Sequence, residues 1–192
     1  MNGQLRLAIQ IFKDAYPKRF LHQLESGQLE MDRLDYLRRD SFYTGVTEGN
    51  IGSARIIKML DVADDRLVVE SKGIYSIENF LTARRLMYWQ VYLHKTSVAY
   101  EKMLISTLLR AKELASQGVE LFASPALRFF LYNDINPTEF YNNPDCLENF
   151  IQLDDNDIWT ALKVWSTQTD KILSTLRTGM KNLNIYKVEY TS

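Results

Sequence analysis

Two stripes of polar and aromatic residues carry the strongest chemical signal in the sequence. The first lies within residues 31–45. It consists of Asp32, Tyr36, Asp40 and Tyr43, whose successive separations in the sequence are 4, 4 and 3 positions. Residues at this spacing share one face of an α-helix. Two carboxylates and two phenols could contact a ribose or a base. The same spacing also suits a solvated helix face with Asp–Arg pairs, and the spacing alone favours that interpretation.

The second stripe joins cations to phenols on another predicted helix. It consists of Arg84, Tyr88, Tyr92 and Lys95, which are separated by 4, 4 and 3 positions, with His94 directly before Lys95. A guanidinium binds phosphate through two parallel hydrogen bonds and a phenol stacks on rings, so the stripe suits a phosphorylated ligand that carries a ring. Cations extended over an aromatic core helix would give the same pattern, and the residues alone slightly favour this alternative.

Several other kinds of site are excluded or unsupported. With Cys146 as the single cysteine and only two histidines, the chain cannot form a disulfide scaffold, a thiolate zinc site or a site of many histidines. It contains no Walker A or Gly-x-Gly-x-x-Gly motif. The acidic run at 154–157 is better explained as a helix cap than as a calcium loop, because Trp159 occupies the position where the loop needs glycine.

Composition sets the expected class of protein. The 192 residues have a net charge of −1, which gives no strong signal for nucleic-acid binding, and no apolar run is long enough for a membrane span. The scarcity of cysteine and the lack of a secretory signal favour a cytoplasmic location. With 46% apolar residues, 8 Gly and 4 Pro, the sequence predicts one mainly α-helical domain over residues 1–192.

The elements that must position the two stripes follow from hydrophobic spacing and caps. The pattern predicts one long central helix over 75–117, or two helices with a kink, and a short strand at 66–70, with a second strand suggested by alternation at 184–190. The other expected helices end before Pro17 or cover 18–25, 29–43, 54–60, 124–132 and 155–177. Ser124 is the predicted N-cap of the helix over 124–132, and Gly179 is expected to stop the last helix.

The residues of the first stripe resemble a known family. Residues 32–46, DRLDYLRRDSFYTGV, closely resemble the segment that carries the last metal-ligand aspartate of the HD-domain metal-dependent phosphohydrolases, in the branch of the deoxynucleoside triphosphate triphosphohydrolases. Residues 72–74 and 80–95, the latter FLTARRLMYWQVYLHK, are similar to the long helix that follows in that family. The match is strongest over 28–110 and implies a helical, HD-domain-like fragment.

The resemblance also implies a site. The family holds a divalent metal (Mg, Mn, Fe or Ni) with a histidine, an adjacent His-Asp pair and a later aspartate, and it releases triphosphate from deoxynucleoside triphosphates. Asp32 matches the later aspartate. The resemblance implies that the substrate is bound by Arg33, Tyr36, Asp40, Arg84 and Tyr92 and that a regulatory nucleotide is faced by His94 and Lys95. It also implies a homo-oligomer.

The sequence departs from the family at the metal site. It contains no His-Asp dipeptide, and His22 does not stand where the family places its ligands. A lone carboxylate does not hold a catalytic divalent ion in a defined geometry. We therefore expect a truncated or decayed phosphohydrolase that binds no metal stably and is inactive alone, but that retains part of the nucleotide-binding wall.

Two alternatives remain open. The 23 aromatic residues and the long helix also suit a non-catalytic helical scaffold or oligomerisation module. An unrelated enzyme could use paired carboxylates among Asp32, Asp35 and Asp40, but most such pairs are surface charges, so this alternative ranks last.

Overall fold

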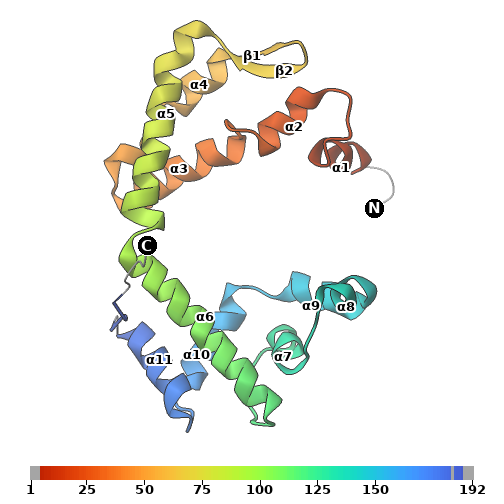
Figure 1. Ribbon diagram of the computed structural model, residues 1–192, viewed down its shortest axis with the longest axis vertical. Coiled ribbons are helices and arrows are strands. Elements are labelled where there is room, and N and C mark those ends of the chain that lie inside the picture. The colour runs from red at the N-terminus through yellow and green to blue at the C-terminus, as the bar shows by residue number, and fades with distance from the viewer. Residues whose placement is uncertain (1–4, 183, 188–192) are drawn as a thin grey trace, which may run out of the picture. The chain divides into compact units, whose positions relative to one another are not determined.

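The computed structural model describes residues 5–182 and 184–187 (Figure 1). Contacts group the chain into two compact units, residues 1–94 and 95–192. The described fold is mainly α-helical with one pair of antiparallel strands, which confirms the predicted fold class. The expected single domain over 1–192 stays a prediction. No described helix combines the length and the apolar character needed to cross a bilayer.

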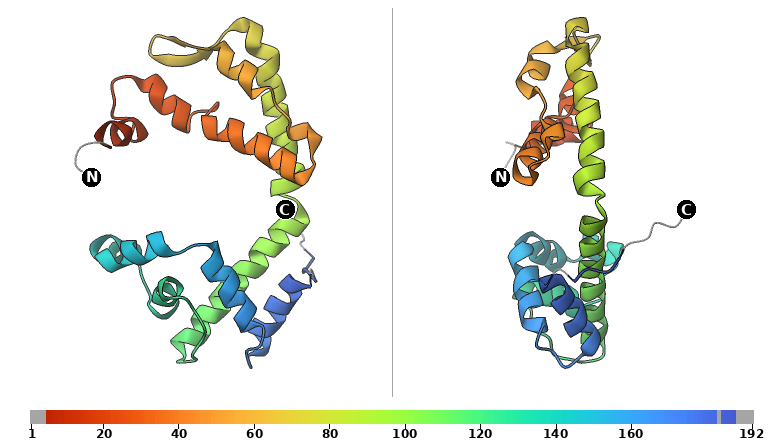
Figure 2. Two further views of the ribbon diagram at one scale, coloured as in Figure 1. Left: turned by 180° about the vertical axis from the view of Figure 1, so that it is seen from behind. Right: turned by 90° about the vertical axis from the view of Figure 1, so that its left-hand side faces the viewer.

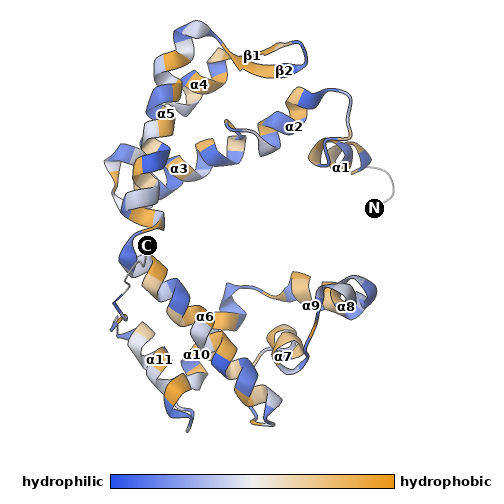
Figure 3. Cartoon of the chain, in the orientation of Figure 1, coloured by the Kyte–Doolittle hydropathy of each residue, from blue (hydrophilic) through white to orange (hydrophobic). Residues whose placement is uncertain are grey.

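The first unit contains helices packed around α3 and α5, together with a β-hairpin. Its elements are α1 (Arg6–Phe12), α2 (Arg19–Ser26), α3 (Met31–Thr44), α4 (Ser53–Met59), β1 (Leu60–Ala63), β2 (Arg66–Val69) and α5 (Ile74–Met87), with 3₁₀ turns at Thr47–Gly49 and Ser71–Gly73. α3 and α5 supply most of the core, which consists of Leu34, Leu37, Ile51, Ile56, Phe80, Ala83 and Met87. Apolar residues recur between polar ones along α3 (Figure 3), and its buried residues are three and four positions apart, as expected of a helix with one buried face.

The hairpin has one predicted strand and one that was not predicted. β2 matches the strand expected at 66–70, and β1 pairs with it so that Ala63 lies opposite Arg66. The turn residues are Asp64 and Asp65, with φ of 49° and 58°. Two consecutive positive φ values belong to the tight turns that fit the twist of a hairpin, and aspartate tolerates that conformation. β2 also packs against α2 (Figure 2).

The predicted long helix over 75–117 is interrupted. α5 is followed by a π-helical segment, Tyr88–Tyr92, and a new helix, α6, begins at Lys95. The N–H of Leu93 donates to the carbonyl of Tyr88, five residues back, at 2.7 Å. This wider turn breaks the regular i→i−4 ladder, so the alternative of two helices is correct and the single helix is wrong.

The second unit is built on α6 (Lys95–Ser116). It continues through α7 (Pro125–Tyr132), α8 (Pro137–Asn142), α9 (Pro144–Gln152), α10 (Asp155–Trp165) and α11 (Lys171–Lys181). Its core surrounds Trp165, which is fully buried and donates its indole N–H to the carbonyl of Phe122 at 2.9 Å. Two predicted caps are confirmed, because Ser124 accepts the N–H of Leu127 and Asp154 forms a capping box with Asp157.

The prediction of one last helix over 155–177 is wrong, because the structure has two helices, α10 and α11, in this region. α10 ends at Trp165 because the polar run 166–169 favours a loop, and Asp170 starts α11 by accepting the N–H of Leu173 at 2.8 Å. Gly179 lies inside α11 instead of ending the helix. Residues 184–187 form no strand, and the rest of the suggested strand at 188–190 lies outside the described residues.

Candidate functional site

The candidate site lies in the first unit, where α3 faces α5 and the π-helical segment. Leu34 and Leu37 of α3 are buried with Phe80, Ala83 and Met87 of α5, and each is at most 3% exposed. This packing fixes the rotation of both helices. The polar residues of the two stripes therefore come from faces next to a shared core.

A hydrogen bond connects the two stripes. The hydroxyl of Tyr92 donates to Oδ2 of Asp40 at 2.6 Å, although the residues are 52 positions apart in the sequence. Burial raises the pKa of Tyr92, and both the hydrogen bond to Asp40 and the negative charge of that carboxylate raise it further. The phenol is therefore neutral at pH 7 and remains a donor to Asp40.

Three tyrosine rings form a cluster beside this bond. The rings of Tyr36 and Tyr92 meet edge to face, with centroids 6.1 Å apart, and those of Tyr88 and Tyr92 do so at 5.2 Å. Burial raises the pKa of the Tyr36 hydroxyl and the nearby Tyr88 adds to the rise, whereas the charges of Arg84 and Arg33 oppose it. Both cations therefore lie near the Tyr36 hydroxyl.

Arg84 has an unused hydrogen-bond donor. Its guanidinium carbon is 5.6 Å from the centroid of the Tyr88 ring, and Arg84 and Tyr88 help to line a cleft of about 340 Å³. Its Nε is buried and has no hydrogen-bond partner among residues 5–182 and 184–187. A buried N–H without an acceptor is unfavourable, so this atom suits an anionic oxygen brought by a ligand.

Asp32 and Arg33 lie at the start of α3. Arg33 Nε pairs with Glu30 Oε1 at 2.7 Å, and both side chains are mostly buried. Asp32 is exposed and lines a cleft of about 530 Å³ together with Glu25 and Glu30. Within the described part of the chain, no three His, Cys, Asp or Glu residues are grouped so that they could hold a metal ion. The role of Asp32 as a metal ligand stays a prediction.

Other members of the stripes do not join the cluster. Tyr43 is 80% exposed and its ring contacts Phe42, with centroids 5.3 Å apart. Asp35 forms an exposed pair with Arg39 at 3.1 Å, as expected of a solvated helix face. His94 and Lys95 stand at the border of the two units, His94 as the last residue of the first and Lys95 as the first of the second.

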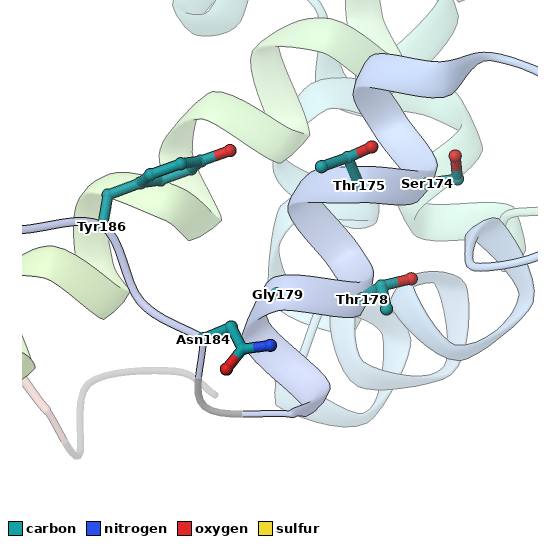
Figure 4. A pocket seen from close by; sticks show the side chains of 6 residues that line it. All are labelled: Ser174, Thr175, Thr178, Gly179, Asn184 and Tyr186. Carbon is teal, nitrogen blue, oxygen red and sulfur yellow. The ribbon is translucent and has the colours of Figure 1, made fainter.

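The second unit contains a pocket that sequence reasoning did not identify. It measures about 420 Å³ and is lined by Ser174, Thr175, Thr178, Gly179, Asn184 and Tyr186 (Figure 4). The small polar residues of α11 recur three and four positions apart, which is the signal in the sequence. None of the described residues that line the pocket is charged, so among them the features of the first unit that fit a phosphate are missing.

Comparisons with known proteins agree with the predicted resemblance. Residues 51–124 match a family model described as the HD associated region. A crystal structure of a phosphohydrolase from Bacteroides thetaiotaomicron is 90% identical and superimposes with a TM-score of 0.96, covering 98% of this chain and 47% of that one. The chain spans less than half the length of the relatives it matches.

Two more distant relatives match most of the chain. An uncharacterized protein of Bacillus subtilis, YwfO, is 29% identical over 93% of this chain and 39% of its own length. A protein of Dictyostelium discoideum named as a deoxynucleoside triphosphate triphosphohydrolase SAMHD1 homolog is 26% identical over 84% of this chain and 26% of its own.

Proposed function

Since the chain belongs to the HD-domain phosphohydrolase family, we propose that it binds a deoxynucleoside triphosphate on the wall formed by α3 and the end of α5. The buried Nε of Arg84, which has no partner among the described residues, carries this proposal because it lies at the edge of the tyrosine cluster. A phosphate oxygen would satisfy that donor.

Each member of the cluster has a role in binding. The rings of Tyr36 and Tyr92 offer apolar surface to the sugar and base, while Asp40 accepts a hydrogen bond from a sugar hydroxyl. A carboxylate can do so while it accepts the Tyr92 hydroxyl, because its two oxygens have about four acceptor positions. Arg33 reaches the phosphates after it exchanges its pair with Glu30. His94 and Lys95 contact a regulatory nucleotide.

The described residues do not fit a metal centre by themselves. HD phosphohydrolases generally use divalent metals, but Asp32 is a single exposed carboxylate and the sequence has no His-Asp pair. Several oxygen or nitrogen ligands are needed to fix a divalent ion. We therefore propose binding of nucleotide without hydrolysis by the chain alone, and no catalytic step is assigned to it.

Calorimetric titration with deoxynucleoside triphosphates tests the binding site. Arg84→Ala should weaken binding by at least about tenfold, because a hydrogen bond to a charged group contributes roughly 1.5–3 kcal/mol. Arg85→Ala is the matched comparison: Arg85 lines the same cleft, but its guanidinium lies over the ring of Trp89, 4.4 Å from its centroid, so its loss should weaken binding much less. Equal loss in both variants, or no binding by the unaltered protein, would contradict the proposal.

An activity assay tests the absence of hydrolysis. The purified chain is incubated with deoxynucleoside triphosphates and Mn²⁺ or Mg²⁺, and released triphosphate is measured. We expect none above background. Metal-dependent release that Asp32→Ala abolishes would overturn this part of the proposal.

A second candidate, an oligomerisation module, is favoured by the surface of α1. Leu7, Ile9, Phe12 and the preceding Leu5 are half exposed or more. An almost wholly apolar cleft of about 540 Å³ is lined chiefly by Leu5, Ala8, Ile9, Ile11 and Phe12. Exposed apolar surface of this kind favours association. Light scattering tests it: Phe12→Asp should shift an oligomer toward monomer, whereas a monomeric unaltered protein would exclude this function.

A further inference from the structure

Tyr88 lies between two groups that the proposed function uses. It follows Arg84 by one helical turn and precedes Tyr92 by another. The Arg84 guanidinium carbon is 5.6 Å from the centroid of its ring, and the Tyr92 ring meets it edge to face at 5.2 Å with an interplanar angle of 77°. One side chain therefore contacts both the cation and the tyrosine that is bonded to Asp40.

The Arg84 guanidinium already donates a hydrogen bond to the Tyr36 hydroxyl, and the Tyr88 ring adds a second contact that restrains the direction of its free donor. An arginine side chain has several rotatable bonds, and fixing them on binding is unfavourable. The face of an aromatic ring attracts a guanidinium and restrains its plane. Because Nε lies in that plane, the Tyr88 ring restrains the direction of the buried N–H that lacks a partner among the described residues.

Tyr88 also begins the π-helical segment. Its carbonyl accepts the N–H of Leu93, and the segment ends at Tyr92. Single π turns in helices occur frequently at functional sites, where they change the direction of the residues that follow. The same residue thus starts the irregular turn and supports the ring at its end.

We propose that Tyr88 is a positioning residue, whose ring orients the Arg84 guanidinium toward phosphate while it holds the Tyr92 ring beside Asp40. The inference rests on the proposed nucleotide site. The aromatic face performs this role and the hydroxyl does not, so phenylalanine should replace tyrosine without loss. The proximity of Tyr88 to both other rings agrees with its effect on their hydroxyls, whose pKa values it raises.

A double-mutant cycle on binding of inorganic triphosphate and a deoxynucleoside triphosphate tests the role. Tyr88→Leu should weaken binding of both by about three- to tenfold, the range expected from loss of a cation–π contact. Tyr88→Phe should bind like the unaltered protein. When Arg84 is already alanine, Tyr88→Leu should have no further effect, because the ring acts through the guanidinium.

A matched control and a second readout separate positioning from a general effect on folding. Trp89→Leu removes the neighbouring cation–π contact with Arg85; because Trp89 lines the same cleft, it should weaken triphosphate binding less than Tyr88→Leu does, and by the same factor with and without Arg84. The NMR signal of the Arg84 Nε–H reports its orientation without any ligand. Its heteronuclear NOE and its protection from exchange with water should fall in Tyr88→Leu and persist in Tyr88→Phe, because they report how firmly the guanidinium is held, whereas a changed chemical shift would report only the removed ring.

The outcomes distinguish the two proposals. If the unaltered protein binds no triphosphate but the NOE and exchange protection of the Arg84 Nε–H depend on the ring, the proposed function fails and the positioning role stands. If triphosphate binds and Tyr88→Leu weakens it equally with and without Arg84, the positioning role is overturned and the nucleotide site stands. An NOE and exchange protection of the Arg84 Nε–H that are the same in Tyr88→Leu would also overturn the positioning role.

Discussion

The bond between Tyr92 and Asp40 shows how single residues define the candidate site. At 2.6 Å it joins a phenol of the π-helical segment to a carboxylate of α3. The phenol must stay protonated to donate, and both burial and the carboxylate charge raise its pKa. This bond orients one oxygen of Asp40 and leaves acceptor capacity for a ligand.

The raised pKa of Tyr92 predicts a loss of stability at alkaline pH. Tyrosine in the unfolded chain ionises near pH 10, whereas folded Tyr92 keeps its proton to higher pH. The bond therefore contributes its full stability below about pH 10, and this contribution is lost as pH rises through the folded pKa. Urea denaturation at about pH 8, 9.5 and 11 should show a smaller decline for Tyr92→Phe than for the unaltered protein.

The control for this prediction is Tyr43→Phe, because the Tyr43 side chain is largely exposed and its ring contacts only Phe42 among the described ring pairs. Tyr43→Phe should show the same decline in the free energy of unfolding at alkaline pH as the unaltered protein. Identical slopes for Tyr92→Phe and Tyr43→Phe would contradict the assignment of the decline to Tyr92.

At the scale of elements, local signals predicted helices better than they predicted interruptions. Amphipathic spacing and the caps at Ser124 and Asp154 were sufficient to place α3, α7 and the start of α10. The π-helical segment was not specified, because no glycine or proline marks it and its turn depends on packing of rings against α3. β1 was missed because it is only four residues long and its partner strand defines it.

The same limit applies to the site. Spacing placed Tyr36 with Asp40 on α3, and Arg84 of α5 with Tyr92 at the end of the π-helical segment that follows it. The contact between Tyr92 and Asp40 depends on the packing of two helices, which the sequence pattern does not specify. The resemblance to a family suggested that they share a ligand, but the bond and the buried Nε of Arg84 emerged only from the structure.

Close packing of the 3₁₀ turn Thr47–Gly49 against α5 predicts that Gly49→Ala is destabilising. A Cβ on Gly49 would lie 2.6 Å from Sδ of the buried Met87 and 2.9 Å from Cβ of Ser41. Overpacking of this kind destabilises by about 1–3 kcal/mol. Urea denaturation should show this loss. Gly52→Ala is the control, because its nearest neighbouring atom would be 3.9 Å away, and equal losses would contradict the packing argument.

In the second unit, Asp170 connects two helices and should contribute to stability in a pH-dependent way. It accepts hydrogen bonds from Arg110 of α6, from Nη2 at 2.6 Å and from Nε at 3.3 Å, and it caps α11 through the N–H of Leu173. The bonds from Arg110 and then that from Leu173 lower the pKa of Asp170. Its contribution is therefore present above about pH 4 and is lost as pH falls through the lowered pKa.

Asp170→Ala should lower the free energy of unfolding at pH 7 by at least about 1 kcal/mol, which is typical of a lost helix cap. Denaturation monitored by tryptophan fluorescence in a Trp89→Phe background, in which only Trp159 and the buried Trp165 emit, measures this loss in the second unit. The difference from the unaltered protein should shrink at about pH 3. Glu113→Gln alters only the exposed partner of Arg110 and should have little effect, so a larger loss there would count against Asp170 as the main contributor.

At the scale of the whole molecule, the two units differ in what they offer a ligand. The first brings cations, phenols and a carboxylate to one cluster, and the second has a pocket lined by hydroxyl and amide groups. The whole chain has a net charge of −1, so it attracts anions only where cations are grouped locally. The nucleotide binding that we propose is therefore assigned to the cluster, and it should depend on Arg84 more than on salt.

This division of roles predicts different effects of nucleotide and metal on stability. A ligand that binds only the folded state raises the melting temperature, by an amount that grows with the logarithm of the ligand concentration above Kd. A deoxynucleoside triphosphate at about 1 mM should therefore raise the melting temperature of the unaltered protein and not that of Arg84→Ala. Mn²⁺ at the same concentration should raise neither, because Asp32 supplies one exposed carboxylate and divalent ions need several fixed ligands. If Mn²⁺ stabilised the protein and Asp32→Ala removed the effect, Asp32 would belong to a complete metal centre and the proposed lack of hydrolysis would lose its physical basis.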